Sequence, residues 1–263
     1  MVRLLLQMSL VGALASTALV ADEWSKTFTI SGRPELRIDT NDGSVNIRTW
    51  DRKVIEARVI TRGWRISPTE VHVVDRQSGD RVELEVRIPR HAFIMDFGHR
   101  SVRVELQVPV ELSSDIHTGD GAITVDGLHG DTRLNTGDGH IEAYKLDGRL
   151  NAQTGDGHVR VRGRFDLLNV HTGDGGIDAD VENGSKMTSE WTIRTGDGHV
   201  TLRLPQSFAA DVDVHTGDGH IQSDLPLTVT GLRHENELRG KLNAGGAPLV
   251  IRTNDGSVRL ERM

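Results

Sequence analysis

Apolar and polar side chains alternate in short blocks between residues 118 and 180, and the blocks recur every nine residues. A block that begins with TGDG carries apolar residues at its sixth and eighth positions, as Ile123 and Val125 show. The intervening blocks follow the same spacing, for example with Leu150 and Ala152. An alternation with a period of two predicts a short strand that buries one face. Each pair of successive blocks therefore predicts two strands and two turns.

The tetrapeptide TGDG marks the repeat. Its copies begin at Thr118, Thr136, Thr154, Thr172, Thr195 and Thr216, and a variant, TNDG, begins at Thr40 and Thr253. The first four TGDG copies are evenly spaced, and a fixed period of this kind is typical of stacked repeat architectures. Because the same strand recurs in the same direction, successive coils must pair in parallel. We therefore predict an all-β fold, a parallel β-solenoid (β-helix-like) whose two-strand coils are about 18 residues long.

The residue types of the tetrapeptide predict a tight turn. We expect its glycines, such as Gly139 and Gly157, to adopt positive φ, and Asn41 and Asn254 to tolerate the same region in the variant. The aspartate between the glycines is expected to accept a hydrogen bond from a nearby backbone N–H. The threonine should face inward at the strand end, with its hydroxyl bonded to another threonine or to the turn backbone.

The regular spacing breaks on both sides of the repeat. Residues 22–117 contain VELEVRI and VRVELQVPV with a turn at 78–80, which predicts antiparallel β-hairpins that cap the open end. Residues 118–224 hold the regular TGDG coils, and residues 225–263 the C-terminal coils with an insertion. VENGSKMTSEWTIR and RHENELRGK are interpreted as loop insertions. The apolar segment HAFIMDFGHR, residues 91–100, is either a contact element or a loop over the open end.

Residues 1–21 have the pattern of a secretory signal peptide. Arg3 precedes an apolar run that ends in small residues, and cleavage fits after Ala18 or after Ala21. An uncleaved membrane anchor is the alternative, although the run is short for a spanning helix. We expect an extracytoplasmic protein, periplasmic or secreted, with no stable membrane insertion after cleavage and with residues 22–263 as a single domain.

Charge and cysteine content exclude several classes of protein. The formal net charge of −7 argues against nucleic acid as a partner. The chain has no cysteine, which excludes disulfides, thiolate metal sites and iron–sulfur clusters. No cofactor is expected.

Calcium binding is one alternative that the turns raise. The nine-residue lines resemble the calcium-binding β-roll, in which aspartate stands at position 6 and an apolar residue at position 8. Here position 6 is apolar and the aspartates stand at position 3, where they form a column: Asp120, Asp138, Asp156 and Asp174. We favour structural turns, with a calcium-binding repeat protein as the alternative.

Histidines flank the tetrapeptide at two positions. His117, His171 and His215 precede the threonine, and His140, His158, His199 and His220 follow the second glycine. We expect His140 to be stacked beside His158, and His199 beside His220. Histidine next to aspartate suits a transition metal. The spacing follows the repeat rather than a known ligand signature, so surface histidines are favoured and no metal site is predicted.

Catalysis is not expected from this pattern. Polysaccharide lyases and hydrolases use β-helix folds and paired carboxylates, but every candidate aspartate here belongs to a repeated turn. The chain contains no GxSxG, HExxH or P-loop pattern. The aromatics that could stack on sugars are few: Trp24, Trp50, Trp64, Trp191 and Tyr144. We therefore predict no catalytic residue and no enzyme, with a polysaccharide-acting enzyme as the alternative.

The chain resembles the bacterial "putative adhesin" β-strand-repeat domains of unknown function, which are related to head-GIN domains. The resemblance rests on ELRIDTNDGSVNIRTWD, on VPVEL before the first TGDG and on the run of TGDG turns, and it covers residues 28–262. It implies a β-helix-like fold and an adhesion-like, binding or envelope-scaffold role without a defined molecular activity. The implied partner is an envelope protein or a glycan of unknown identity, and the oligomeric state stays open.

Overall fold

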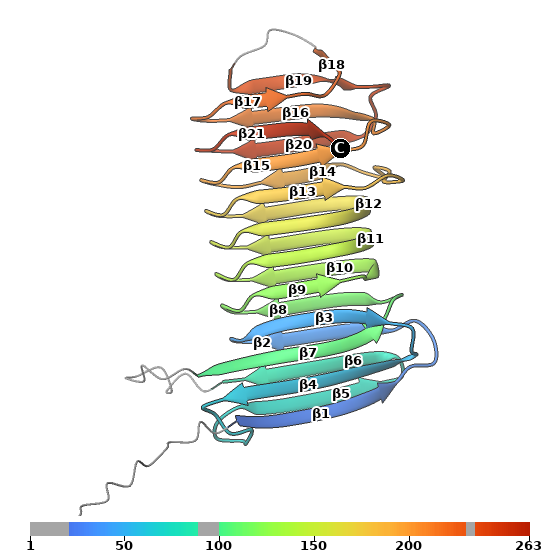
Figure 1. Cartoon of the computed structure of the whole chain (residues 1–263), viewed down its shortest axis with the longest axis vertical. Coiled ribbons are helices and arrows are strands. Elements are labelled where there is room, and N and C mark those ends of the chain that lie inside the picture. Colours follow the sequence, from blue (N-terminus) through green and yellow to red (C-terminus); the bar gives the residue numbers. More distant parts are fainter. Residues whose placement is uncertain (1–20, 89–99, 230–234) are drawn as a thin grey trace, which may run out of the picture.

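The computed structural model of the chain describes residues 21–88, 100–229 and 235–263 (Figure 1). Its regular elements are all β-strands, stacked along one long axis. The predictions for residues 1–20 (most of the signal peptide) and for residues 89–99 (most of HAFIMDFGHR) lie outside the described residues. In the part of the chain that is described, no helix is long and apolar enough to cross a membrane.

The strands form two hydrogen-bonded rows, which we call sheets A and B. Sheet A holds the strands that run into the TGDG and TNDG turns, together with β5 (His72–Ser78) and β6 (Arg81–Arg87) at one end and β18 (Leu227–Val229) and β19 (Glu237–Leu242) at the other. Its spatial order is β5, β6, β2 (Glu35–Thr40), β8 (Ser113–Thr118), β10 (His129–Thr136), the second part of β11 (Ile141–Thr154), the second part of β12 (Val159–Thr172), β14 (Trp191–Arg194), β20 (Pro248–Thr253), β16 (Ala210–Thr216), β19 and β18.

Sheet B holds the strands that leave these turns, together with β1 (Ala21–Thr29), β4 (Val54–Arg62) and β7 (Ser101–Pro109) at one end. Its order is β1, β4, β7, β3 (Ser44–Trp50), β9 (Ile123–Asp126), the first parts of β11 and β12, β13 (Ile177–Val181), β15 (Val200–Leu204), β21 (Val258–Arg262) and β17 (Ile221–Ser223). β11 and β12 belong to both sheets because each continues around the corner opposite the TGDG turn.

The predicted parallel solenoid is confirmed. Ile141 pairs with Val159, and Leu150 pairs with Leu168, in each case one repeat further along the chain and in parallel. The inward residues of both sheets meet in one core that runs the length of the stack. Their alternation with exposed positions is the period-two pattern of the sequence.

The glycines of the TGDG turn are required for a different reason from the one predicted. Gly139 and Gly157 do not adopt positive φ, and neither do Asn41 and Asn254; among the glycines of the tetrapeptides only Gly43 does, with φ of 104°. A Cβ placed on Gly157 would instead lie 1.9 Å from the carbonyl oxygen of Gly139. The constraint is therefore the contact between backbones of successive coils, which leaves no space for a side chain.

The threonine links one coil to the next in every turn but the first, where Thr40 donates to the carbonyl of Asp42 in its own turn. Thr154 is buried, as predicted, and its hydroxyl donates to the carbonyl oxygen of Gly139 on the preceding coil at 2.8 Å. The same hydroxyl oxygen accepts a hydrogen bond from the N–H of Gly157 in its own turn at 3.2 Å. Thr118, Thr136, Thr172, Thr195, Thr216 and Thr253 donate to the equivalent carbonyls.

The coils that carry TNDG do not stack in sequence order. β2 and β3 lie between β6–β7 on one side and β8–β9 on the other. β20 and β21, the last strands of the described chain, lie between β14–β15 and β16–β17. Both variant coils are therefore inserted into the stack. The coil of β20 and β21 interrupts the run of TGDG coils in residues 118–224.

Antiparallel strands cover both ends of the stack. The turn at Gly79 joins β5 and β6 in the predicted hairpin, whereas β1, β4 and β7 form an antiparallel row. β6 and β7 do not pair with each other but pair in parallel with β2 and β3. The two segments interpreted as loops are partly strands, because WTIR forms β14 and ELRGKL forms β19.

We predict that Gly157→Ala destabilises the fold by about 3 kcal/mol, because the added Cβ forces two coils apart. Gly79→Ala is the matched control, since Gly79 has φ of 60° and a Cβ added there would meet no atom within 4 Å. Its cost should be about 1 kcal/mol, from the left-handed backbone alone. The free energies of unfolding come from urea titrations. If Gly79→Ala is at least as costly, backbone contact is not the dominant constraint.

We also predict that a disulfide forms between Arg194→Cys and Arg252→Cys, which are opposite each other on β14 and β20. Neighbouring strands are about 4.8 Å apart, within the reach of a disulfide. Arg194→Cys with His215→Cys is the control, because β20 separates β14 from β16. The chain has no native cysteine, so thiol titration after mild oxidation reports the bond directly. A bond in the control pair alone would show that the coils stack in sequence order.

Candidate functional site

Two adjoining hollows lie on the outer face of sheet A. The first, of about 390 Å³, is lined by residues of β2, β6, β8, β10 and β11, among them the outward Arg37 and Asp115. The second, of about 510 Å³, continues over β12 and β14 to Arg194. They share Arg133 and Asn151. We call this continuous surface the polar trough.

A ladder of side-chain amides forms the middle of the polar trough. Asn135 donates to Gln153 at 3.3 Å, and Asn169 donates to Asn151 at 3.1 Å. The oxygen of Asn169 accepts from the backbone N–H of Thr192 at 3.1 Å. An amide has two N–H donors and two acceptor lone pairs, so each rung keeps hydrogen-bonding capacity for a ligand.

Ion pairs flank the amides. Arg133 lies 3.7 Å from Asp115, and Arg149 lies 3.6 Å from Asp131. All four side chains are exposed, so the pairs contribute little to stability and their charges face solvent. The trough therefore presents hydrogen-bond donors, acceptors and both signs of charge to solvent.

Tryptophan, tyrosine and phenylalanine are absent from the described residues that line the polar trough. Trp191, one of the residues considered for sugar stacking, is fully buried among aromatic rings of the core. Trp24 packs against the core from the side, and Trp50 and Trp64 lie under arginine side chains.

The predicted column of turn aspartates is present and points outward. Asp120, Asp138, Asp156 and Asp174 are all exposed. The expected hydrogen bond from a neighbouring N–H is described for the first variant turn, where the N–H of Gly43 donates to Asp42 at 2.5 Å. Among the described residues, the aspartates of this column do not group with two further ligands.

The histidine column is only partly as predicted. His140 and His158 lie on adjacent coils, since the N–H of Ile141 donates to the carbonyl of His158 at 3.0 Å, but the ring contact of His158 is with His199. The prediction that His199 and His220 are neighbours is wrong. Ser257 of the inserted coil lies between them, because its carbonyl accepts from Val200 at 3.0 Å while the carbonyl of His220 accepts from Val258 at 2.9 Å.

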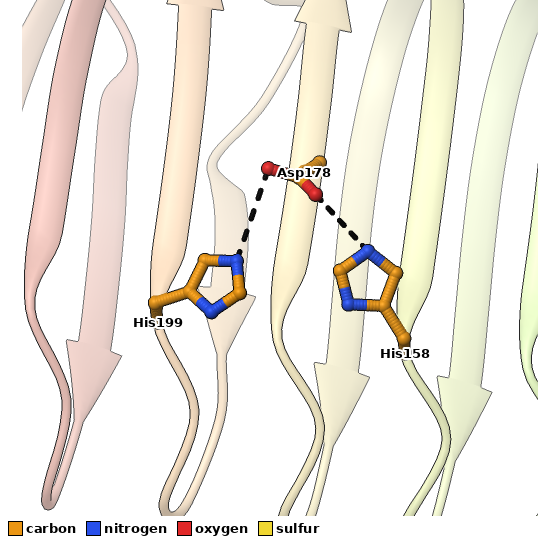
Figure 2. Close-up of side chains that lie close together, drawn as sticks. All are labelled: His158, Asp178 and His199. Carbon is orange, nitrogen blue, oxygen red and sulfur yellow. Dashed lines mark ion pairs between the residues drawn. The ribbon is translucent and has the colours of Figure 1, made fainter.

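A different pair of histidines meets across one coil (Figure 2). His158 Nε2 lies 3.0 Å from one carboxylate oxygen of Asp178, and His199 Nε2 lies 4.0 Å from the other. These three side chains are the group among the described residues that could hold a metal ion. The histidine-next-to-aspartate pattern gave the residue types, but the stacking of coils was needed to identify the partners.

Two mostly parallel sheets around one core and a shared TGDG turn define a β-solenoid repeat protein. The chain belongs to the Toastrack DUF4097 family, which matches residues 33–261 and is a family of unknown function. The resemblance noted in the sequence is thereby confirmed. No curated protein matches the chain.

Solved structures to which the chain is similar come from several bacteria. A putative cell adhesion protein from Clostridium sporogenes is 16% identical, with a TM-score of 0.46, over 93% of this chain and 100% of that one. A putative adhesin from Bacteroides fragilis is 10% identical, with a TM-score of 0.41, over 94% and 98%. A putative lipid binding protein from Parabacteroides distasonis is 10% identical, with a TM-score of 0.38, over 92% and 97%.

The ion pairs of sheet A predict an acid-sensitive contribution to stability. The hydrogen bond from Arg252, at 2.8 Å, lowers the pKa of Asp213 below its usual value. The folded state then binds fewer protons than the unfolded state, so this stability is present above about pH 4 and is lost as the pH falls further. We expect Arg252→Met to cost up to about 1 kcal/mol at pH 6 and less at pH 3.

Arg149→Met is the control for this prediction, because its pair with Asp131 is longer and more exposed. Urea titrations at both pH values give the free energies of unfolding. A deficit of Arg252→Met that stays constant between pH 6 and pH 3 would contradict the prediction.

Proposed function

We propose that the mature protein acts outside the cytoplasm, in the periplasm or after secretion, as a non-catalytic adhesion-like or envelope-scaffold protein. The observation that carries this proposal is the polar trough, a continuous hydrogen-bonding surface on a rigid stack of parallel strands. The signal-peptide pattern of residues 1–21 supports the location.

The side chains of the trough indicate which kind of partner it would bind. Amides such as Asn151 and guanidinium groups such as Arg133 recognise hydroxyl, carbonyl and carboxylate groups through directional hydrogen bonds. Surface glycans and extended peptide segments of envelope proteins present these groups at regular intervals. Rungs one strand spacing apart, about 4.8 Å, offer matching repeated contacts. We therefore assign the trough to an envelope protein or glycan.

We predict that the purified chain from residue 22 binds a component of the native envelope without changing it. A glycan array and a pulldown from envelope extract give the bound partner, and chromatography of the mixture reports any cleavage product. Asn135→Ala combined with Asn151→Ala should weaken binding about tenfold or more, the value expected for losing hydrogen bonds worth about 1 kcal/mol each.

Asn46→Ala combined with Gln222→Ala is the matched control, because both side chains project from sheet B. It should bind as the wild type does. An equal loss of binding in both double variants would show that the trough is not the binding surface. Released oligosaccharide would instead support the alternative, a polysaccharide-acting enzyme.

A further inference from the structure

Gly176 interrupts the histidine column of sheet B. Along the stack it occupies the place between His158 and His199. The carbonyl of Gly176 accepts from the N–H of Val159 at 2.9 Å, and the carbonyl of His199 accepts from the N–H of Ile177 at 2.8 Å. His158, Gly176 and His199 therefore lie on three successive coils, and only the middle one lacks a side chain.

The missing side chain lets the two histidines approach each other. Two strand spacings separate their backbones, roughly 9.5 Å. Their ring centroids are nevertheless only 5.9 Å apart, with the planes tilted by 40°. A Cβ on Gly176 would lie 2.4 Å from Cε1 of His199, so the imidazole occupies space that any other residue would fill.

Asp178 lies between the rings as the third member of the group (Figure 2). It projects from β13, two residues after Gly176, and its two carboxylate oxygens face the two Nε2 atoms. Nε2 of His158 is buried and makes no hydrogen bond with in-line geometry to a described residue, although it lies 3.0 Å from the carboxylate. The three ligand atoms all lie within 4.8 Å of one another.

We propose that His158, Asp178 and His199 form a binding site for a divalent transition metal ion, with Zn²⁺ as the best match. Two imidazoles and one carboxylate are a ligand set that zinc uses, and water completes the tetrahedron. Bonds of about 2.1 Å place the ligand atoms of a tetrahedron about 3.4 Å apart, so the side chains, whose ligand atoms lie within 4.8 Å of one another, must shift slightly. His199 has the freedom to do so, since its side chain is 55% exposed. Nitrogen ligands disfavour Ca²⁺ and Mg²⁺.

The neighbouring strands on both sides determine the charge around the group. Arg160 of β12 opposes a cation, since its guanidinium lies 3.9 Å from Asp178. Glu142 of β11 lies 3.5 Å from the same guanidinium and can retain it when a metal takes over the carboxylate. On the other side, β15 places the neutral Thr201 beside Asp178. The ion would therefore replace Arg160 as the partner of Asp178 without leaving either charge alone.

The test is calorimetric titration of Zn²⁺ into the metal-stripped chain from residue 22, with a melting curve for each state. We expect one ion per chain and a rise in melting temperature that Ca²⁺ and Mg²⁺ do not produce. His199→Gln should weaken Zn²⁺ binding at least tenfold. His220→Gln is the matched control, because the same column carries it two coils away from His199, and it should bind as the wild type does.

Gly176→Ala gives an independent variant that keeps all three ligands. Its Cβ displaces the ring of His199, so Zn²⁺ binding should again fall at least tenfold while circular dichroism still reports a β-fold. If His199→Gln does not fold, Gly176→Ala still tests whether the three side chains bind Zn²⁺. The proposal is overturned if Zn²⁺ does not bind saturably below about 1 mM, or if His220→Gln weakens binding as much as His199→Gln.

Discussion

Contact between the backbones of successive TGDG turns determines the rest of this structure. The last glycine of every turn except the first, such as Gly157, lies directly against the carbonyl of the equivalent glycine on the neighbouring coil. The buried hydroxyl of Thr154 then joins the two turns by one donated and one accepted hydrogen bond. Because this contact repeats from the turn at Gly121 onward through the stacked TGDG turns and the second TNDG turn, it fixes the register of both sheets and the direction in which the outer side chains point.

Near both ends of the sequence, the spatial order of the coils differs from their order along the chain. The two TNDG coils lie inside the stack, although they stand near the ends of the sequence. Asn41 shows one use of the variant residue, since its amide exchanges two hydrogen bonds with the backbone of Ile88, at 2.7 and 2.8 Å. Antiparallel strands then cover the terminal coils, which limits the exposed strand edges that promote aggregation.

The sequence is sufficient to predict the solenoid, the register of its coils and the inward threonines. Few other folds are compatible with apolar residues that alternate with a period of two inside a longer fixed repeat. Spatial order at the ends was not predictable. The interval between Thr216 and Thr253 shows an insertion but not which coil the last strands will join. The role of the glycines was also missed, since their constraint comes from a neighbouring coil and not from their own backbone angles.

The same reasoning explains why a candidate site can arise in so regular a molecule. Identical coils present identical columns, in which each outer side chain meets its own equivalent about 4.8 Å away. Distinct chemistry requires a coil that departs from the repeat. Gly176 is such a departure, because it removes one side chain from the histidine column and brings His158 and His199 to Asp178. The inserted coil has the opposite effect, since Ser257 separates His199 from His220. The repeat therefore supplies a rigid frame, and its exceptions determine which side chains can act together.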